Sequence, residues 1–495
     1  MADFRLLSST YLGGPAADSA QAVDIGPDGI IWLSGLIRDE NFGLTPSGNA
    51  QATGAVLRLS ADGRKAESLL RWGNSVDDLE VAAISGQAAA ISEAGLALIA
   101  ADGKQVLWQK PLTPAGGGSS KGPGRRVSIG KSGIVAALHG KTITTFDAAG
   151  TQLGEWALGN AFVEDLAVDE ASKLVIVTGF DNKKLSSANT GCASCPVQVA
   201  YMYAYDYAGT KKWTNWAWSG TEMDNGNEAD TRGYRLSLGR DGKLCFGGES
   251  AGGNSMFRYD PRKLGVTTIV SGDKYTQAYN TASNHISYFG RFNPADGAPL
   301  GGQLILARLP NTKGNTLRMQ AVTCDEQGDI YVGGVTAWGI DSTTRLSVGD
   351  KKSALAGGYL LKVSADFKKR LLWTTFDAAT YASNVRGVAA AGGKIAVALV
   401  AESDSLLVID AIQTKGNGVT KVLTDAGLAV VASDASGIKE RTSQRNLGNT
   451  VAWEFTVLGP RRNAQAVLFN RDGQPLQLDG RLIPRAERPS SLSKP

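Results

Sequence analysis

Several features are scarce in this sequence. Among 495 residues there are two histidines, four cysteines and 16 prolines, and the formal net charge is only +4. No apolar run approaches the roughly 18 residues that a membrane-spanning helix needs, so we expect no membrane span. The lysines and arginines are scattered, which excludes the basic surface of a nucleic-acid-binding protein. The low proline content also argues against a disordered, proline-rich chain.

The N-terminus and the cysteines bear on the compartment. Residues 1–5 lack the segments of a signal peptide, so the protein is either cytosolic or has lost a leader. Cys192 and Cys195 are separated by two residues, a spacing that fits a small disulfide loop, two free thiols or half of a zinc site. Cys245 and Cys324 stand alone in apolar strand patterns, and we interpret each as a small buried hydrophobic residue.

Glycine, by contrast, is abundant, with 61 residues, and it recurs in a repeated pattern. Two alternating segments, 22–25 and 30–34, lie on either side of a Pro-Asp-Gly turn. This arrangement predicts a β-hairpin with a side-chain period of two on each arm. Weaker copies follow along the chain at 82–92, 127–137, 167–179, 237–248, 323–334 and 389–399.

A second hairpin follows most copies of the first and is often followed by a tryptophan, which suits packing between neighbouring units. These tryptophans are Trp72, Trp108, Trp156, Trp213 and Trp373. Repeated four-stranded antiparallel units that cannot bury both faces alone are typical of a β-propeller. We therefore predict an all-β, WD40-like propeller of four-stranded blades, with seven blades as the prediction and eight as the alternative. The predicted blades span 18–73, 76–113, 124–159, 161–220, 231–319, 320–378 and 383–445.

The connections between the two hairpins of a blade differ greatly in length. They are almost absent in blades two and three. Equivalent loops of a propeller leave one face, so we expect the variable material to lie on a single side. The long connections are 36–53, 181–198, 249–302, 335–357 and 401–426.

The two ends of the chain are expected to close the ring. Residues 4–12 resemble the last strand of a blade without the preceding three, and we predict that they complete the blade made by the C-terminal part. Segments within 450–478 are alternatives, as closing strands or as part of an eighth blade. We assign residues 1–480 to a single propeller, with the insert 249–302 in blade five, and expect a disordered tail at 481–495.

Several stretches resemble the SBBP, or seven-bladed β-propeller, repeat family. They are Ser9–Gly14, Ala22–Asp24, Gly29–Gly35, Gly328–Gly334 and Asp410–Gly418. The match is good in blades one, six and part of seven, and blade five departs from the repeat through its insert. Such proteins are mostly secreted or surface-attached in bacteria, so the resemblance implies an extracellular, cell-surface or periplasmic location. The family defines no catalytic residues, so the resemblance assigns none.

The densest polar stretch outside the repeat is 225–318. Its predicted ligand-binding set is Arg232, Tyr234, Glu249, Ser250, Asn254, Arg258, Tyr259, His285 and Arg291. In a pocket, Glu249 or His285 would act as acid or base, the arginines would hold an anion, and Tyr259 with the nearby Tyr288 would stack on sugar or peptide. The alternative is that a long loop uses these side chains for its own internal hydrogen bonds.

Residues 222–230 carry oxygen-bearing side chains at alternating positions around a glycine. Asp224, Glu228 and Asp230 are therefore calcium candidates, although the stretch lacks the length and the final glutamate of an EF-hand. We predict no other cofactor.

No catalytic set converges in the sequence, and the long loops gather on one face. We therefore predict a secreted or surface-exposed propeller that binds a protein or carbohydrate partner, or serves in assembly, through the long-loop face. A polysaccharide-active hydrolase or lyase with a pocket in blade five is the first alternative. A structural subunit of an extracellular lattice or fibre is the second.

Overall fold

The computed structural model is almost entirely β-structure. Arg5–Ala432 forms one compact unit, and residues 433–495 belong to a second. The structure describes residues 4–112, 119–120, 124–184, 196–223, 229–267, 285–309, 314–340, 344–417, 419, 422–433, 443–447, 450–454, 468–469 and 475–476.

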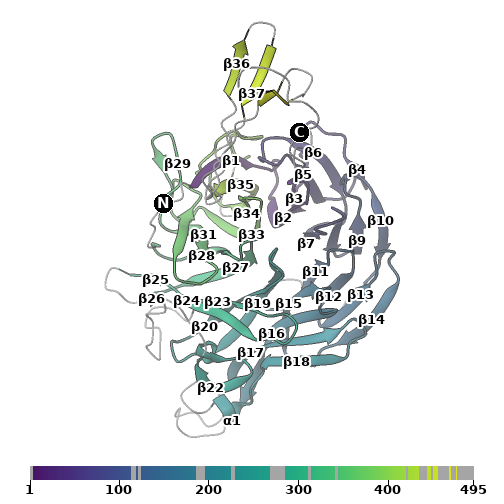
Figure 1. Cartoon of the computed structure of the whole chain (residues 1–495), viewed down its shortest axis with the longest axis vertical. Helices are drawn as coiled ribbons and strands as arrows, with labels where there is room; N and C mark the ends of the chain where they lie inside the picture. The colour runs from purple at the N-terminus through teal and green to yellow at the C-terminus, as the bar shows by residue number, and fades with distance from the viewer. Residues whose placement is uncertain are drawn as a thin grey trace. The chain divides into compact units, whose positions relative to one another are not determined.

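Seven four-stranded antiparallel sheets follow one another around a ring, and Figure 1 shows them side by side. Blade one consists of β2 (Ser19–Ile25), β3 (Ile31–Leu36), β5 (Gly54–Leu59) and β6 (Ala66–Arg71), with the short β4 (Ser47–Gly48) beside β6. Blade two consists of β7 (Val76–Val81), β8 (Ala88–Ser92), β9 (Gly95–Ile99) and β10 (Val106–Lys110). Blade three consists of β11 (Arg125–Ile129), β12 (Val135–His139), β13 (Thr142–Phe146) and β14 (Gln152–Ala157). Blade four consists of β15 (Phe162–Asp169), β16 (Leu174–Lys184), β17 (Pro196–Asp206) and β18 (Lys211–Trp216).

The remaining blades continue the ring. Blade five consists of β19 (Thr231–Leu238), β20 (Leu244–Ser250), β23 (Ile286–Phe292) and β24 (Pro299–Ile305). Blade six consists of β27 (Leu317–Cys324), β28 (Ile330–Thr336), β31 (Gly357–Val363) and β32 (Arg370–Thr375). Blade seven consists of β33 (Ser383–Ala391), β34 (Lys394–Ala401), β35 (Asp425–Ser433) and β1 (Phe4–Tyr11). The first strand of each blade packs against the first strands of its two neighbours, which closes the ring at the centre.

Short elements lie in the connections of this unit. They are α1 (Gly220–Met223), the 3₁₀ turn η2 (Met256–Arg258), β21 (Tyr259–Asp260), β22 (Lys263–Thr267), β25 (Ala307–Arg308), β26 (Gly314–Asn315), β29 (Ser347–Val348) and β30 (Lys351–Lys352). The second unit contains two hairpins, which are β36 (Ser443–Leu447) with β37 (Thr450–Glu454), and β38 (Leu468–Phe469) with β39 (Pro475–Leu476).

The prediction of seven blades is confirmed, and so is the closing role of the N-terminal strand. The strand β1 pairs with β35, and bridges from Ser9 to Ile409 and from Tyr11 to Gln413 fix it to blade seven. The alternative of closing strands within 450–478 is wrong, because β1 takes the closing position in blade seven and the described strands of 450–478 lie in two separate hairpins. The last strand of the seven sheets ends at Ser433, before the predicted end of blade seven at residue 445. The tail 481–495 lies outside the described residues.

The apolar core lies between blades. The tryptophans that follow the second hairpins belong to it: Trp72 packs between blades one and two, and Trp373 packs with residues of blades five and six. Each blade buries its two faces against its neighbours, because a four-stranded sheet alone leaves both faces in water.

A β-bulge recurs in the first strand of six blades. In each case one residue has no partner on the second strand, and these residues are Gln21, Asp77, Glu164, Tyr234, Gln320 and Arg386. In four of these blades, the residue just before the bulge pairs with a glycine of the second strand. At Gly334 a Cβ would lie 1.9 Å from the carbonyl oxygen of Arg318, and at Gly35 it would lie 2.0 Å from that of Ser19. The repeated glycine is therefore required by close approach of the bulged strand.

Candidate functional site on the face of the long connections

One face of the propeller carries the long connections. In an antiparallel blade, the connection from the second to the third strand leaves the same edge as the connection to the next blade. In blades two and three, the connection from the second to the third strand has only two residues. The others have long ones, at 37–53, 185–195, 251–285, 337–356 and 402–424, of which 185–195, 268–284, 341–343, 418 and 420–421 lie outside the described residues. We call this side the long-connection face.

The insert of blade five is shorter than the predicted 249–302. The strands β23 and β24 occupy most of 286–305, and β20 continues to Ser250, so the connection spans 251–285. The sequence of 286–305 did not indicate strands, because glycines and polar residues that pair within the sheet interrupt its apolar alternation.

An aromatic patch is exposed on the long-connection face of blade six. It consists of Trp338, Leu355 and Tyr381, which are 38%, 40% and 43% exposed. Trp338 and Leu355 belong to the 337–356 connection, and Tyr381 to the connection from blade six to blade seven. Large exposed apolar side chains that gather in this way mark interaction surfaces more often than scattered ones do.

Hydrogen bonds hold this patch in place. The hydroxyl of Tyr381 donates to the carbonyl of Ala337 at 2.9 Å, and its backbone N–H donates to Ala356 at 3.1 Å. Tyr381 has a φ of +59°, an uncommon conformation for an aromatic residue, and such strain often accompanies function. The patch is therefore fixed before any partner arrives.

Three residues of the predicted set, Arg232, Glu249 and His285, do come together on this face. Glu249 is buried, and its Oε1 lies 2.6 Å from both the Arg232 Nη1 and the His285 Nδ1. Arg232 also pairs with Asp230 at 3.2 Å and donates to the side chain of Gln198. The network therefore ties blade four to the start of blade five.

The contacts of the His285 ring nitrogens involve two charged neighbours. The Nη2 of Arg318 lies 2.7 Å from the His285 Nε2, and a guanidinium can only donate, so Nε2 is the acceptor. The Nδ1 atom on the other side of the ring lies 2.6 Å from the Glu249 carboxylate. Both ring nitrogens are thus engaged, and general acid–base catalysis would require Arg318 to move away.

The other predicted residues are dispersed. Ser250 is buried and donates to the carbonyl of Gly252, and Arg258 donates to Gly253. Arg291 lies at the opposite end of β23, paired with Asp241. Tyr234 is a buried bulge residue, Asn254 is partly buried in the turn before η2, and Tyr259 packs against the core between blades four and five. Tyr288 is buried and stacked on Phe257, so it offers no face to a sugar.

The calcium candidates are only partly described. Asp224 and Glu228 lie outside the described residues, and Asp230 is engaged with Arg232 and with the backbone N–H of Gln198. Among the residues that the structure describes, no three His, Cys, Asp or Glu gather as a metal site requires. In the same part of the chain no helix is long and apolar enough to cross a membrane.

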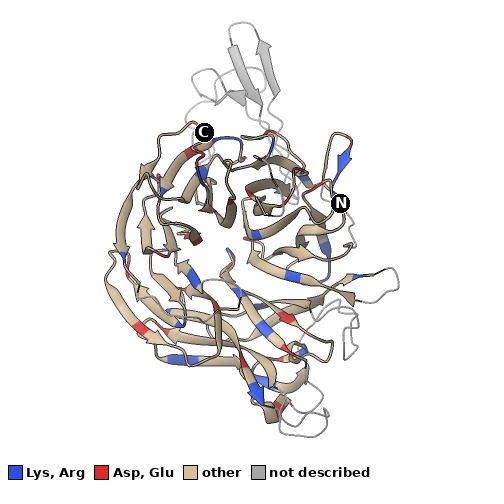
Figure 2. Cartoon of the chain, turned by 180° about the vertical axis from the view of Figure 1, so that it is seen from behind, with Lys and Arg blue, Asp and Glu red and all other residues tan. Residues whose placement is uncertain are grey.

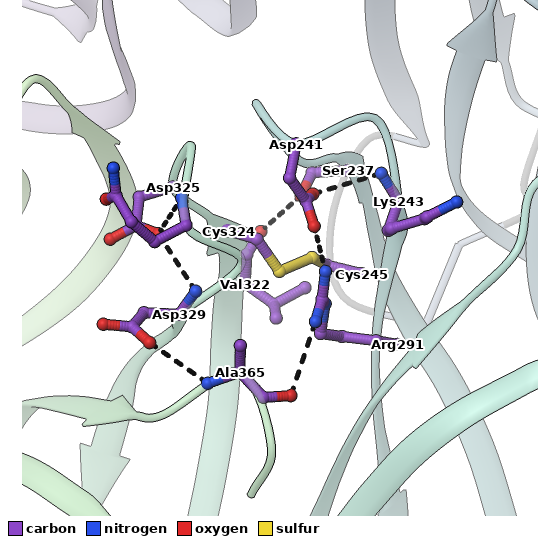
Figure 3. Close-up of a disulfide and its surroundings, with 11 residues drawn as sticks. Ser237, Asp241, Lys243, Cys245, Arg291, Val322, Cys324, Asp325, Asp329 and Ala365 are labelled. Atoms are coloured by element: carbon purple, nitrogen blue, oxygen red, sulfur yellow. Dashed lines mark hydrogen bonds and ion pairs between the residues drawn. A yellow bond between two sulfur atoms is a disulfide. The ribbon is translucent and has the colours of Figure 1, made fainter.

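The interpretation of Cys245 and Cys324 as separate buried thiols is wrong, because they form a disulfide. Figure 3 shows the bond between β20 of blade five and the end of β27 of blade six, with a Cα–Cα distance of 6.6 Å. Both cysteines are fully buried, and the ion pair of Arg291 with Asp241 lies beside them. Cys192 and Cys195 lie outside the described residues, so their state stays a prediction.

The centre of the ring contains a second candidate site, which sequence reasoning missed. A cavity of about 850 Å³ is lined by residues from the first strands of all seven blades. Figure 2 shows residues of both charge signs on the strands around this centre. Since bulges re-aim side chains, five of the six bulge residues line the cavity, and a charged pair such as Asp77 and Asp78 can face it together.

Polar side chains of these strands also tie each blade to the next. The backbone N–H of Val81 donates to Asp24 at 2.8 Å, and that of Ile129 donates to Glu80 at 3.1 Å. Burial raises the pKa of Glu80 to about 8, with the charge of Asp24 as the next cause. At the opposite face, Arg240 of blade five pairs with Asp24 of blade one at 3.4 Å, so it crosses that end of the cavity.

Comparisons with protein-family models and with curated proteins gave no match. Among solved structures, the chain is similar to the "RRP9 WD40 repeats", with a TM-score of 0.49 and 8% identity over 87% of this chain and 99% of that one. It is similar to "U3-55K", with a TM-score of 0.48 and 7% identity over 86% and 99% of the two chains. It is similar to a chain of the "Mitotic Checkpoint Complex", with a TM-score of 0.44 and 11% identity over 80% of this chain and 89% of that one. The seven-bladed propeller is established by the strand pairing of this chain, whereas membership of the SBBP family stays a prediction.

Proposed function

We propose that this propeller is a non-catalytic binding module that docks an acidic surface of a partner protein on its long-connection face, outside the cytosol. The observation that carries the proposal is the exposed, hydrogen-bonded aromatic patch of Trp338, Leu355 and Tyr381. Tryptophan and tyrosine are enriched among the residues that dominate binding energy at protein interfaces. A fixed patch also loses little conformational entropy when a partner binds.

The charge of the connection that carries the patch favours an acidic partner. The connection that carries Trp338 and Leu355 also contains the hairpin β29–β30, in which Lys351 and Lys352 are both exposed. Basic side chains at the rim of an aromatic patch speed association with an acidic surface and weaken it with a basic one. Binding should therefore weaken as salt is raised.

The geometry favours binding over the hydrolase or lyase alternative. Glu249 is held by Arg232 and His285, and both nitrogens of His285 are engaged, so the pair serves to tie the blades together. A polysaccharide-active enzyme would need a base that can reach its substrate.

The disulfide supports the location. Structural disulfides persist in oxidising compartments and are rare in reducing ones. The pair Cys245–Cys324 therefore favours a secreted, surface or periplasmic protein, in line with the expectation from the SBBP-like stretches.

The experiment places a photo-crosslinking amino acid at position 338 and, as a control, at Ile84, which is 73% exposed on the opposite face. Crosslinking is done in the extracellular and envelope fractions of the source cells. We expect one acidic protein at position 338 and not at position 84. The purified partner should then bind at least about tenfold more weakly to Trp338→Ala than to the wild type, and equally well to Ile84→Ala.

Three results would contradict the proposal. They are equal crosslinking at both positions, an affinity that Trp338→Ala leaves unchanged, and binding of a glycan panel in place of a protein. A crosslink to a second copy of this chain would support the lattice alternative instead. Turnover of a polysaccharide that Glu249→Gln abolishes would establish the enzyme.

A further inference from the structure

Three arginines from three different blades extend into the central cavity. They are Arg126 on β11, Arg235 on β19 and Arg386 on β33, and all three line the cavity. Burial lowers the pKa of both Arg235 and Arg386, and the nearby charge of Arg126 lowers each pKa further. Arg235 and Arg386 also share a neighbour, since both donate to Gln320 of β27, at 2.6 and 2.8 Å.

These arginines have more donors than acceptors. Within the described residues none of the three is in an ion pair shorter than 4.0 Å, unlike Arg125 beside them, which pairs with Asp77. Arg126 donates to a backbone carbonyl at 3.4 Å, Arg235 to two carbonyls, and Arg386 to one side-chain oxygen. A guanidinium carries five N–H donors, so several of them have no acceptor among the residues that the structure describes.

Three carboxylates lie near Arg126, and each also accepts a hydrogen bond from the wall of the cavity. Asp78 accepts the backbone N–H of Val127, Asp165 accepts that of Leu236, and Glu164 accepts from two serines. They reduce the long-range field of the arginines without occupying their donors. A ligand held here would therefore be recognised by short hydrogen bonds rather than by net charge.

We propose that Arg126, Arg235 and Arg386 form a binding site for a phosphate or sulfate group carried by a small molecule. Planar guanidinium groups bind tetrahedral oxyanions through paired N–H donors, and three of them arranged around one cavity can surround such a group. This proposal does not depend on the aromatic patch, which lies in the outer loops.

The size and openness of the cavity set the class of ligand. A volume of about 850 Å³ lies within the range of small-molecule sites. Because Arg240 crosses the opposite end, entry is expected from the long-connection face. The remainder of the ligand would meet polar side chains such as Gln21 and Gln320, which suits a polar body such as a sugar.

The site should bind more tightly at lower pH. Burial raises the pKa of Asp165 to about 6, against the charges of Arg126 and Arg235, and burial raises the pKa of Asp78 as well. As the pH falls through about 6, Asp165 becomes neutral and no longer offsets the positive charge of Arg126 and Arg235. Sulfate keeps its charge throughout this range, so its affinity should rise several-fold between pH 7.5 and 5.5. The other titratable groups facing the cavity are Asp24, Asp77, Glu80, Glu164, Arg125, Lys131, Arg240 and Glu326.

The test is titration calorimetry of the whole chain with sodium sulfate and with inorganic phosphate, at constant ionic strength in sodium chloride. We expect one site with a dissociation constant of about 1 mM or tighter, and no heat from chloride. Arg386→Gln and Arg126→Gln should each weaken sulfate at least tenfold. Arg262→Gln is the matched control, because Arg262 is an exposed arginine paired with Asp260 outside the cavity.

Localisation of the ion keeps the proposal testable if a variant fails to fold. Crystals of the wild type soaked in selenate should show an anomalous peak among the three guanidinium groups. The proposal is overturned by a peak elsewhere only, by equal weakening in Arg262→Gln, or by sulfate heat that both cavity variants leave unchanged.

Discussion

Breaking the disulfide between Cys245 and Cys324 should lower the stability of the propeller by a calculable amount. The cysteines are 79 residues apart in sequence, and in the loop-entropy treatment a cross-link of this length lowers the free energy of folding by about 4.5 kcal/mol. For a compact unit spanning 5–432, the unfolding entropy is about 0.9 kcal/mol/K, so the melting temperature should fall by about 5 °C. The loss comes from the greater freedom of the unfolded chain.

Single and double variants separate the cross-link from simple packing. In a Cys192→Ala/Cys195→Ala background, Cys245→Ala, Cys324→Ala and the double variant should show nearly the same fall by calorimetry, since either change removes the whole bond. If the two sulfurs only filled space, the two single effects would add in the double variant.

Peptide mapping under non-reducing conditions checks the bond itself. A digest of the unreduced protein should contain a linked pair of peptides holding residues 245 and 324. Absence of that pair, or a double variant that melts within about 1 °C of its background, would refute the reasoning.

Two further predictions test a buried carboxyl group at the centre of the ring and a close backbone approach beside a bulge. Since burial lifts the pKa of Glu80 from 4.5 to about 8, the fold loses stability as pH rises between these values, because unfolded Glu80 ionises there while folded Glu80 keeps its proton. Glu80→Gln keeps the acceptor for Ile129, so at pH 9 it should be more stable than the wild type by at least about 1 kcal/mol in the free energy of unfolding. At pH 5 the two proteins should be about equally stable. A stability difference that does not widen with pH contradicts this prediction. Gly334→Ala would place a Cβ 1.9 Å from the carbonyl of Arg318 and should cost about 2 kcal/mol or more in urea unfolding, whereas Gly159→Ala, with no atom within 4 Å, should cost far less.

Much of the fold was predictable because local patterns determine it. Alternating apolar residues on either side of glycine turns gave the blade bounds, as in 76–113 against the observed Val76–Lys110. The isolated strand at the N-terminus gave the closure of the ring. The C-terminal strand that pairs with it could not be chosen from the sequence, because β35 and the segments within 450–478 have similar apolar content.

The features that depend on distant contacts were not predictable in the same way. Cys245 and Cys324 follow ordinary strand patterns, and only the packing of β20 against β27 brings them together. Trp338 lies in a loop and has no sequence signal that separates it from the tryptophans between blades. For the predicted blade-five pocket, chain proximity did gather Arg232, Glu249 and His285, but it also suggested Arg291, which strand length carries to the other end of the sheet.

The bulges explain why the central cavity was also missed. In a regular strand, successive side chains point to opposite faces of the sheet. One acid of Asp77–Asp78, and one of Glu164–Asp165, would then point into the apolar core between blades. A bulge removes this conflict, because the extra residue lets both side chains turn toward the cavity. In blade four the consecutive acids Glu164–Asp165 and the glycine Gly179 on the next strand accompany such a bulge, whereas the consecutive Arg125–Arg126 of blade three lie in a strand without one. The bulge at Arg386 likewise brings a guanidinium to the wall of the central cavity.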